Sequence, residues 1–315
     1  MADVARLGKL HPRYVTEILG CLACADFVAY SPDHDAYAID PAQAKVLADA
    51  TFPLHGAGWF DMVPALYQAI PGVAGAASTP GKLTGVPFSD QSEWGFGKGM
   101  HRCNAPGIKA AYTRKWLLRS VPHVVGALEA GIKVADLGTG MGAVAFALAN
   151  SFPNSTVTGI DLDAPSIHRA NTLNPGLANL KFRCMDSKDI EPDTFDLITN
   201  HDCIHDLVDP VGVLRSVRAA LKPGGVFFSM EPRTAGETMQ ENFAAAQAGG
   251  ALAQGAVAMQ YGLSTLHCAS PARLCATVPA CSVAFGLRAC VRSGGGQGEG
   301  GGWVGGEAGG GGGAS

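Results

Sequence analysis

The sequence has 315 residues, of which 47% are hydrophobic and 16% are charged, so most of the chain can bury an apolar core. Lys and Arg number 23 against 27 Asp and Glu, which gives a formal net charge of −4. Such a balance has little attraction for phosphates or anionic lipids, and it argues against a nucleic-acid coat and against a polybasic membrane binder.

Charge and cysteine usage predict a cytoplasmic protein. Charged residues interrupt Met1–Gly20, which a secretory signal peptide would not tolerate. The long uncharged stretch Asn242–Leu266 is rich in Ala, Gly and Gln, and it predicts a soluble helical region and not a membrane span. The nine cysteines are odd in number and irregularly spaced, which predicts reduced, buried thiols; we interpret Cys21 and Cys24 as small core residues on a helix and not as half a zinc site.

Residues 1–50 predict a partial winged-helix module. Apolar residues from Tyr14 to Leu22 recur at helical spacing, and two short strands, Phe27–Tyr30 and Tyr37–Ile39, flank the turn Ser31–Asp35. The module holds four basic and seven acidic residues, so DNA binding is disfavoured, and we expect a packing or dimerisation role.

Residues 51–125 predict helices with long loops that cover an acceptor pocket. A helix is expected around Trp59–Ile70, a loop over the Gly/Pro/Ser-rich stretch Pro71–Gly85 and again at Gly95–Gly99, and a helical run over Lys109–Leu118.

From Ile132 onward, apolar strands alternate with helices. The predicted strands are Lys133–Leu137, Thr156–Ile160, Leu180–Cys184, Phe195–Thr199 and Val226–Met230. The helices between them are Ala143–Asn150, Ala164–Leu173 and Val211–Leu221. This alternation predicts an α/β fold with a Rossmann-like, doubly wound, mostly parallel sheet that binds ligands at the carboxyl ends of its strands.

The first of these strands leads into a glycine-rich turn. Asp136 is followed by Gly138, Gly140 and Gly142, and glycines at a strand-to-helix turn let the backbone approach a cofactor closely. With Ala143 the same run also satisfies the dinucleotide fingerprint, so the turn alone leaves the cofactor open.

Two further carboxylates favour S-adenosylmethionine. Asp161 closes the second strand, where it can accept hydrogen bonds from ribose hydroxyls, and Asp186 follows the third strand, where it can accept from an adenine amino group. Three acidic strand ends suit a cofactor with a sulfonium and an ammonium group, whereas they would repel a pyrophosphate.

Together with the turn Leu221-Lys222-Pro223-Gly224-Gly225, these features resemble class I S-adenosylmethionine-dependent methyltransferases, in the two-domain type with an N-terminal winged helix. His11–Val15 and Leu266-His267-Cys268 resemble the same subgroup. The resemblance covers residues 4–270, with the methyltransferase domain expected at 126–270. It implies transfer of a methyl group to a small-molecule acceptor, and possible homodimers. It also assigns cofactor-binding residues, namely Asp136, Gly138, Gly140, Gly142, Asp161, Leu162, Asp186, Ser187 and Asn200.

The chain departs from this family at both ends. The leading helix of the winged-helix module is not recognisable. Residues 271–292 show no strand–helix–strand succession like the one that closes the class I sheet, and the Gly-rich run 293–315 is predicted to be disordered because glycine cannot offset its ordering entropy. Our hypothesis is that residues 271–315 are an alternative or misread segment.

The segment Asn200-His201-Asp202-Cys203-Ile204-His205-Asp206 follows the fourth strand and supplies the catalytic candidate. His205 resembles the base of plant-type O-methyltransferases, and a histidine suits removal of a hydroxyl proton during methyl transfer. Asp206 is expected to point away from His205, and Glu231 is a candidate to orient it. His201 is expected to be a pocket wall or a structural group.

Three alternatives remain open from the sequence. His201 and His205, four apart on one helix face, could share a zinc ion, although Asp202 is shorter than the Glu of zinc proteases and no third ligand is evident; we predict no metal. The glycine turn could serve an NAD(P)-dependent oxidoreductase. The incomplete sheet could leave a catalytically impaired cofactor-binding protein.

Overall fold

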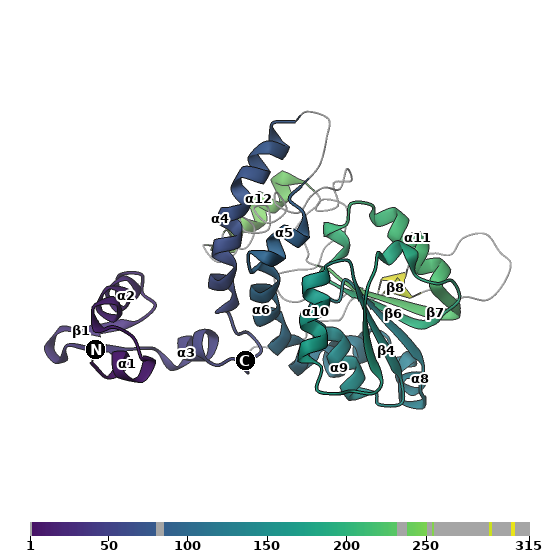
Figure 1. The fold of residues 1–315 in the computed structure, drawn as a ribbon, viewed down its shortest axis with the longest axis horizontal. Helices are drawn as coiled ribbons and strands as arrows, with labels where there is room; N and C mark the ends of the chain where they lie inside the picture. Colours follow the sequence, from purple (N-terminus) through teal and green to yellow (C-terminus); the bar gives the residue numbers. More distant parts are fainter. Residues whose placement is uncertain are drawn as a thin grey trace.

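The computed structural model describes residues 2–79, 85–231 and 238–250, together with residues 254, 290–291 and 304–305. The chain begins with α1 (Ala2–Gly8) and α2 (Pro12–Cys24), and then a hairpin of β1 (Ala29–Ser31) and β2 (Ala36–Ala38) around the short helix η1 (Pro32–His34). A helix followed by two antiparallel strands is present as predicted, with the strands shifted by one or two residues. With α3 (Pro41–Ala48), this module projects away from the rest of the molecule (Figure 1). Its identity as a winged helix stays a prediction.

The prediction that the cysteines are buried is wrong for most of the cysteines that the structure describes. Cys21 and Cys24 lie on α2 with exposed side chains, and Cys184 is exposed as well. Cys103 is buried and Cys203 is half-buried. All five are free thiols, and only Cys103 has the expected burial.

The region before the sheet is more helical than predicted. Helix α4 spans Gly58–Ala77 and continues through Pro64 and Pro71, so the loop expected from Pro71 begins only at Ser78. The loop expected at Gly95–Gly99 is also wrong, because α6 begins at Phe96. The remaining helices of this region are α5 (Phe88–Glu93), α6 (Phe96–Ala111), the π-helix η2 (Tyr112–Leu117), α7 (Leu118–Ser120), η3 (Pro122–Val124) and α8 (Val125–Ala130).

The sheet has the predicted doubly wound architecture. Its parallel strands are β3 (Lys133–Leu137), β4 (Thr156–Asp161), β5 (Leu180–Cys184), β6 (Phe195–His201) and β7 (Leu221–Met230). They lie in the order β5-β4-β3-β6-β7, followed by the antiparallel β8 and β9. Helices α9 (Ala143–Ser151), α10 (Ala164–Leu173) and α11 (Pro210–Ala220) connect the strands, and two short turns, η4 (Ser187–Asp189) and η5 (Ile204–Asp206), follow β5 and β6. The predicted strands and helices are confirmed to within two residues, except that β7 begins five residues early and includes the expected turn at Lys222–Gly225.

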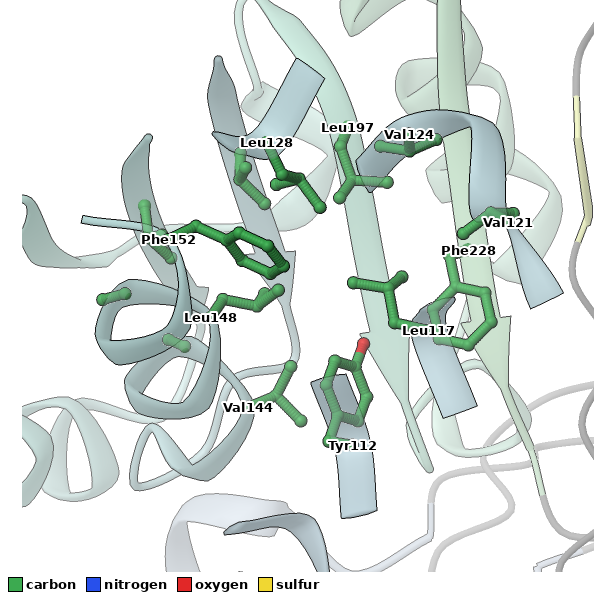
Figure 2. Packing of buried hydrophobic residues seen from close by; sticks show 14 of the residues in the cluster. Tyr112, Leu117, Val121, Val124, Leu128, Val144, Leu148, Phe152, Leu197 and Phe228 are labelled. Carbon is green, nitrogen blue, oxygen red and sulfur yellow. The ribbon is translucent and has the colours of Figure 1, made fainter. Parts of the chain in front are cut away.

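Apolar side chains bury both faces of the sheet, as a parallel sheet requires. On one face, α9 and the segments from η2 to α8 pack over β3, β6 and β7. Figure 2 shows Leu148 of α9 and Phe152, which follows α9, directed toward this cluster, with Leu197 and Phe228 projecting from the strands. On the other face, α11 packs its buried Val213 against a second cluster. Helices thus cover the sheet on both faces and hold the strands in place. The loops at the ends of the strands are held in place with them.

After β7 the described residues are few. Helix α12 (Met239–Ala248) lies at the start of the predicted Ala-rich region, and its first turn carries a capping box between Thr238 and Glu241. Residues 251–253 and 255–266 of that region lie outside the described residues, and so does the segment Leu266-His267-Cys268. The two-residue strands β8 (Cys290–Val291) and β9 (Val304–Gly305) extend the sheet, and the disorder expected over 293–315 stays a prediction. In the part of the chain that the structure describes, no helix has the length and apolarity to cross a membrane.

Candidate active site at the carboxyl ends of the strands

The predicted site residues come from neighbouring strands. In the parallel register, Leu137 pairs with Ile160 and with Asn200, Asp161 pairs with Cys184, and His201 pairs with Met230. The carboxyl ends of β3 to β7 therefore meet at one edge of the sheet. All predicted cofactor and catalytic residues lie on this edge or in the loops that leave it.

Gly140 is the open position in the glycine-rich turn. Its φ of +52° is a left-handed conformation that side chains rarely adopt, and a Cβ built there would meet no atom within 4 Å. The turn thus presents bare backbone to open space at this residue. A ligand can approach the chain here more closely than any side chain would allow.

Gly138 and Gly142 have a different role, although both also have positive φ. A Cβ on Gly138 would collide with the Sγ of Cys203, and one on Gly142 would lie 2.6 Å from the ring of Phe182. These two glycines let neighbouring side chains pack against the turn. They therefore shape the turn, while Gly140 faces outward.

The carboxylate of Asp161 lies next to Gly140. Its Oδ2 accepts a hydrogen bond from the Gly140 N–H at 2.7 Å, and its Oδ1 accepts one from the Asp163 N–H at 2.9 Å. Each oxygen keeps a further lone pair for a ligand hydroxyl. Burial raises the pKa of Asp161, while the backbone hydrogen bonds oppose that rise.

Asp136 lies beneath the same turn and is 1% exposed. Its oxygens accept hydrogen bonds from Thr139 Oγ1 at 2.6 Å and from Thr199 Oγ1 at 2.8 Å. Burial raises the pKa of Asp136 to about 6 against the opposing effect of these hydrogen bonds. The side chain therefore anchors the turn to β6 from below, and cofactor contact by Asp136 stays a prediction.

The other predicted cofactor residues border the turn. Leu162 is 71% exposed beside Asp161, where an apolar side chain can lie against a flat ligand ring. Asp186 caps η4 by accepting from the Lys188 N–H at 2.8 Å, and the neighbouring Ser187 is half-buried. Asn200 is buried and donates to the Leu137 carbonyl at 3.1 Å, which ties β6 to the start of the turn.

His205 lies in η5 and is surrounded by carboxylates. Its Nδ1 lies 2.6 Å from Glu231 Oε2, which is the orienting contact expected from the sequence. Its Nε2 lies 3.3 Å from Asp206 Oδ1 and 3.7 Å from Asp202 Oδ1. The expectation that Asp206 points away from His205 is wrong, because η5 is a tight 3-10 turn and not the α-helix on which that expectation rested.

Glu231 also holds the backbone of this turn. Its carboxylate accepts from the N–H groups of Cys203 at 3.2 Å and of Ile204 at 2.9 Å, in addition to the His205 ring. Burial alone would lower the pKa of His205, but the Glu231 hydrogen bond and the charges of Asp206, Asp202 and Glu231 outweigh it and raise that pKa to about 10. His205 is therefore an imidazolium at neutral pH.

His201 is a wall residue of the same region. Its ring stacks on Trp116 of η2 at a centroid distance of 6.4 Å and an interplanar angle of 6°, and Tyr112 meets it edge-on. Burial lowers the pKa of His201. Because His201 ends β6 and His205 lies in η5, the two do not share a helix face, and the zinc-protease arrangement is not the one observed.

A cavity of about 170 Å³ lies against β4 and β5. It is lined in part by Thr158, Lys181 and Arg183, and none of the predicted site residues lines it.

Sequence reasoning missed four contributors to the site. Thr139 and Thr199 bind the buried Asp136, and the signal for the first was its place inside the glycine-rich turn. Asp202 faces His205, and its signal was an acidic residue three positions before a candidate base. Nothing in the sequence pointed to Cys203 as the residue that packs against Gly138.

Comparisons with known proteins agree with the predicted fold. Residues 128–270 match the family described as Methyltransferase domain. The ubiquinone biosynthesis O-methyltransferase of Pseudomonas syringae pv. tomato is 36% identical over 106 residues, which cover 32% of this chain and 44% of that protein. The corresponding enzyme of Chromobacterium violaceum is 37% identical over 112 residues, covering 34% of this chain and 47% of that protein. The chain thus spans less than half the length of these relatives.

Two solved structures resemble about three quarters of the chain. A putative O-methyltransferase from Nostoc punctiforme has a TM-score of 0.54 at 15% identity and covers 76% of this chain and 72% of its own. The mitomycin 7-O-methyltransferase has a TM-score of 0.50 at 17% identity, with coverage of 78% and 73%. At these identities the likeness concerns the fold. Residues 128–270 of this chain therefore match a methyltransferase domain, and the described residues among them share the Rossmann-like fold of these two methyltransferase structures.

Proposed function

We propose that this chain transfers a methyl group from S-adenosylmethionine to a hydroxyl group of a small-molecule acceptor. One observation carries the proposal. The open Gly140 backbone and the Asp161 carboxylate lie on the same sheet edge as the His205–Glu231 pair, so a cofactor site and a proton-handling group adjoin. The similar proteins of Pseudomonas syringae and Chromobacterium violaceum are O-methyltransferases, which supports a hydroxyl acceptor.

The residues around the glycine-rich turn fit the cofactor. Gly140 leaves room for the ligand where a Cβ would intrude, and Asp161 keeps lone pairs for ribose hydroxyls. The exposed Leu162 can cover one face of the adenine, and Asp186 can accept from its amino group. When bound, S-adenosylmethionine supplies a methyl group on a positively charged sulfur, and the carboxylates of this edge favour that charge.

The acceptor side belongs to the loop after β6. His205 projects from η5 with its Nδ1 fixed by Glu231, which leaves Nε2 as the atom that can exchange a proton with the acceptor. His201 and Trp116 form an apolar wall nearby, and such a wall suits an aromatic acceptor. Positioning and proton removal are the main contributions a protein makes to methyl transfer.

The test is a turnover assay with a panel of phenols and alcohols, in which the methylated product and the demethylated cofactor are both quantified. His205→Gln should reduce kcat by about 10²–10⁴-fold without changing cofactor affinity. His34→Gln, in the N-terminal hairpin, is the matched control and should match the wild type. An unchanged kcat in His205→Gln would contradict the assigned role of His205.

The assay also separates the two other functions. If the cofactor binds but no acceptor in the panel is methylated, the chain is a cofactor-binding protein without this activity. If NAD binds more tightly than S-adenosylmethionine, the oxidoreductase alternative replaces our proposal. Both results would refute methyl transfer.

We further infer that residues 1–50 form a dimerisation module, that residues 51–125 cover the acceptor pocket, and that the protein is cytoplasmic. The exposed apolar side chains Leu7, Tyr14 and Ile18 on α1 and α2 support self-association of the module. Light scattering of the full chain and of the Tyr14→Glu/Ile18→Glu variant tests it: a dimer that becomes a monomer supports the inference, and a wild-type monomer contradicts it.

A further inference from the structure

The backbone at Asp202 is unusual for a residue with a side chain. Asp202 follows β6 with a φ of +54°, in the left-handed region that costs energy for any residue other than glycine. Its N–H donates to the Met230 carbonyl at 2.7 Å, which ties this conformation to the end of β7. The chain therefore turns sharply just where β6 ends, and the Asp202 side chain is directed toward η5.

The consequence of this turn is a second carboxylate at Nε2 of His205. Asp202 Oδ1 lies 3.7 Å from Nε2, and Asp206 Oδ1 lies 3.3 Å from the same atom. Nδ1 on the opposite side of the ring is held by Glu231 at 2.6 Å. Both ring nitrogens thus face carboxylates, an arrangement that suits an imidazole carrying a proton on each nitrogen.

An imidazole that carries a proton on each nitrogen cannot remove a proton from the acceptor hydroxyl. To take a proton at Nε2, His205 must first have none there, and the acceptor oxygen must reach the position where the two carboxylates now lie. We propose that Asp202 and Asp206 form a carboxylate pair that holds a proton on Nε2 of His205 in the free enzyme, and that the acceptor hydroxyl has to displace this pair before His205 can act. This inference rests on the proposed function.

The proton balance of the cycle follows. The free enzyme releases the Nε2 proton to solvent, and His205 becomes a neutral imidazole that can take a proton at Nε2. The hydroxyl proton then moves to Nε2 while the acceptor oxygen bonds to the methyl carbon, the methyl–sulfur bond breaks and the sulfur keeps the electron pair. The imidazolium is restored, and one proton is released in each turnover.

Among the residues that the structure describes, three carboxylates face His205. Glu231 faces it from the end of β7, Asp202 from the loop after β6, and Asp206 from η5 itself. His201 lies at the end of β6, where burial lowers its pKa and the charges of Asp202 and Glu231 oppose that change. The Cys203 thiol adds no charge, because burial and then Glu231 raise its pKa. Because Glu231 also holds the backbone, Asp202 is the better member of the cluster to vary.

The experiment compares Asp202→Asn with Asp202→Gly. Both residues tolerate a left-handed backbone, and both remove the charge. Loss of an opposite charge at this distance should lower the pKa of His205 by about 1 unit. The pH dependence of kcat/KM should then shift to lower pH by about 1 unit, so that kcat/KM at pH 7 rises by up to about tenfold. Asp193→Asn, a left-handed aspartate at the other end of β6, is the matched control and should not shift the profile.

A second readout does not depend on activity. The ring resonances of His205, assigned by comparison with His205→Gln, report its proton state in the free protein by NMR. A titration midpoint well above 7 that falls in both Asp202 variants supports the carboxylate pair even if no acceptor is methylated, in which case the proposed function fails alone. An equal midpoint in wild type and variants, or a kcat/KM profile that does not move while methyl transfer continues, would overturn the inference.

Discussion

Replacing Glu231 tests the carboxylate cluster through protein stability, independently of any substrate. Its side chain is 8% exposed and accepts hydrogen bonds from three backbone N–H groups and from the ring of His205. Glu231→Gln keeps the size of the side chain and removes the charge. The amide can still accept from the backbone, so the change falls mainly on the His205 contact.

The expected magnitude follows from the pKa of His205. A rise from 6.5 in the unfolded chain to about 10 in the folded protein corresponds to about 5 kcal/mol, as an upper bound shared by all three carboxylates. This contribution is present in full below about pH 6.5 and is lost as the pH rises to about 10, because the folded protein then releases the proton that the unfolded chain has already lost. We expect Glu231→Gln to reduce the free energy of unfolding by about 2–3 kcal/mol near pH 6.5.

Urea unfolding at several pH values between 6.5 and 10 measures this effect. The difference between wild type and Glu231→Gln should shrink as the pH rises, because at pH 10 the wild type has also lost most of its charge–charge stabilisation. Glu191→Gln is the control and should show no such trend, because Glu191 lines the cavity against β4 and β5 and does not contact His205. A difference between wild type and Glu231→Gln that is the same at every pH would refute the reasoning.

Two further substitutions test the glycine-rich turn. Gly140→Ala places a Cβ in the open space and strains a left-handed backbone, so cofactor affinity should fall at least tenfold while the fold persists. Isothermal calorimetry measures the affinity and circular dichroism checks the fold. Unchanged affinity would contradict a close approach of the cofactor to the backbone. Thr199→Val removes a hydrogen bond to the ionised form of Asp136. The free energy of unfolding should fall by about 1–3 kcal/mol at pH 7 but by less at pH 4, where Asp136 is protonated. Urea unfolding at the two pH values measures this loss, and an equal loss at both would contradict the buried charge.

The alternation of strands and helices could be read from the sequence because the strands of a parallel sheet are buried on both faces. Leu180–Cys184 and Ala164–Leu173 have the bounds expected from their apolar patterns. The continuation of α4 through Pro64 and Pro71 could not be read, since proline favours a helix end locally and the packing of α4 against α6 overrides that preference.

The site was predictable in its residues more than in their contacts. The glycine spacing and the acidic strand ends indicated the turn and Asp161. These patterns did not indicate that Gly140 alone of the three glycines faces open space, because that depends on Cys203 of the loop after β6 and on Phe182 of β5. The direction of Asp206 depended on η5 being a 3-10 turn, which no local pattern revealed.

The central claim is that the edge beside Gly140 and Asp161 binds S-adenosylmethionine. Calorimetric titration of the full chain with S-adenosylmethionine, with its demethylated product and with NAD tests it most directly. We expect one site that binds both sulfur compounds and binds NAD weakly. Asp161→Ala should weaken binding by about 2–4 kcal/mol through the loss of two charge-assisted hydrogen bonds. Absence of binding, tighter binding of NAD, or undiminished affinity in Asp161→Ala would contradict the account.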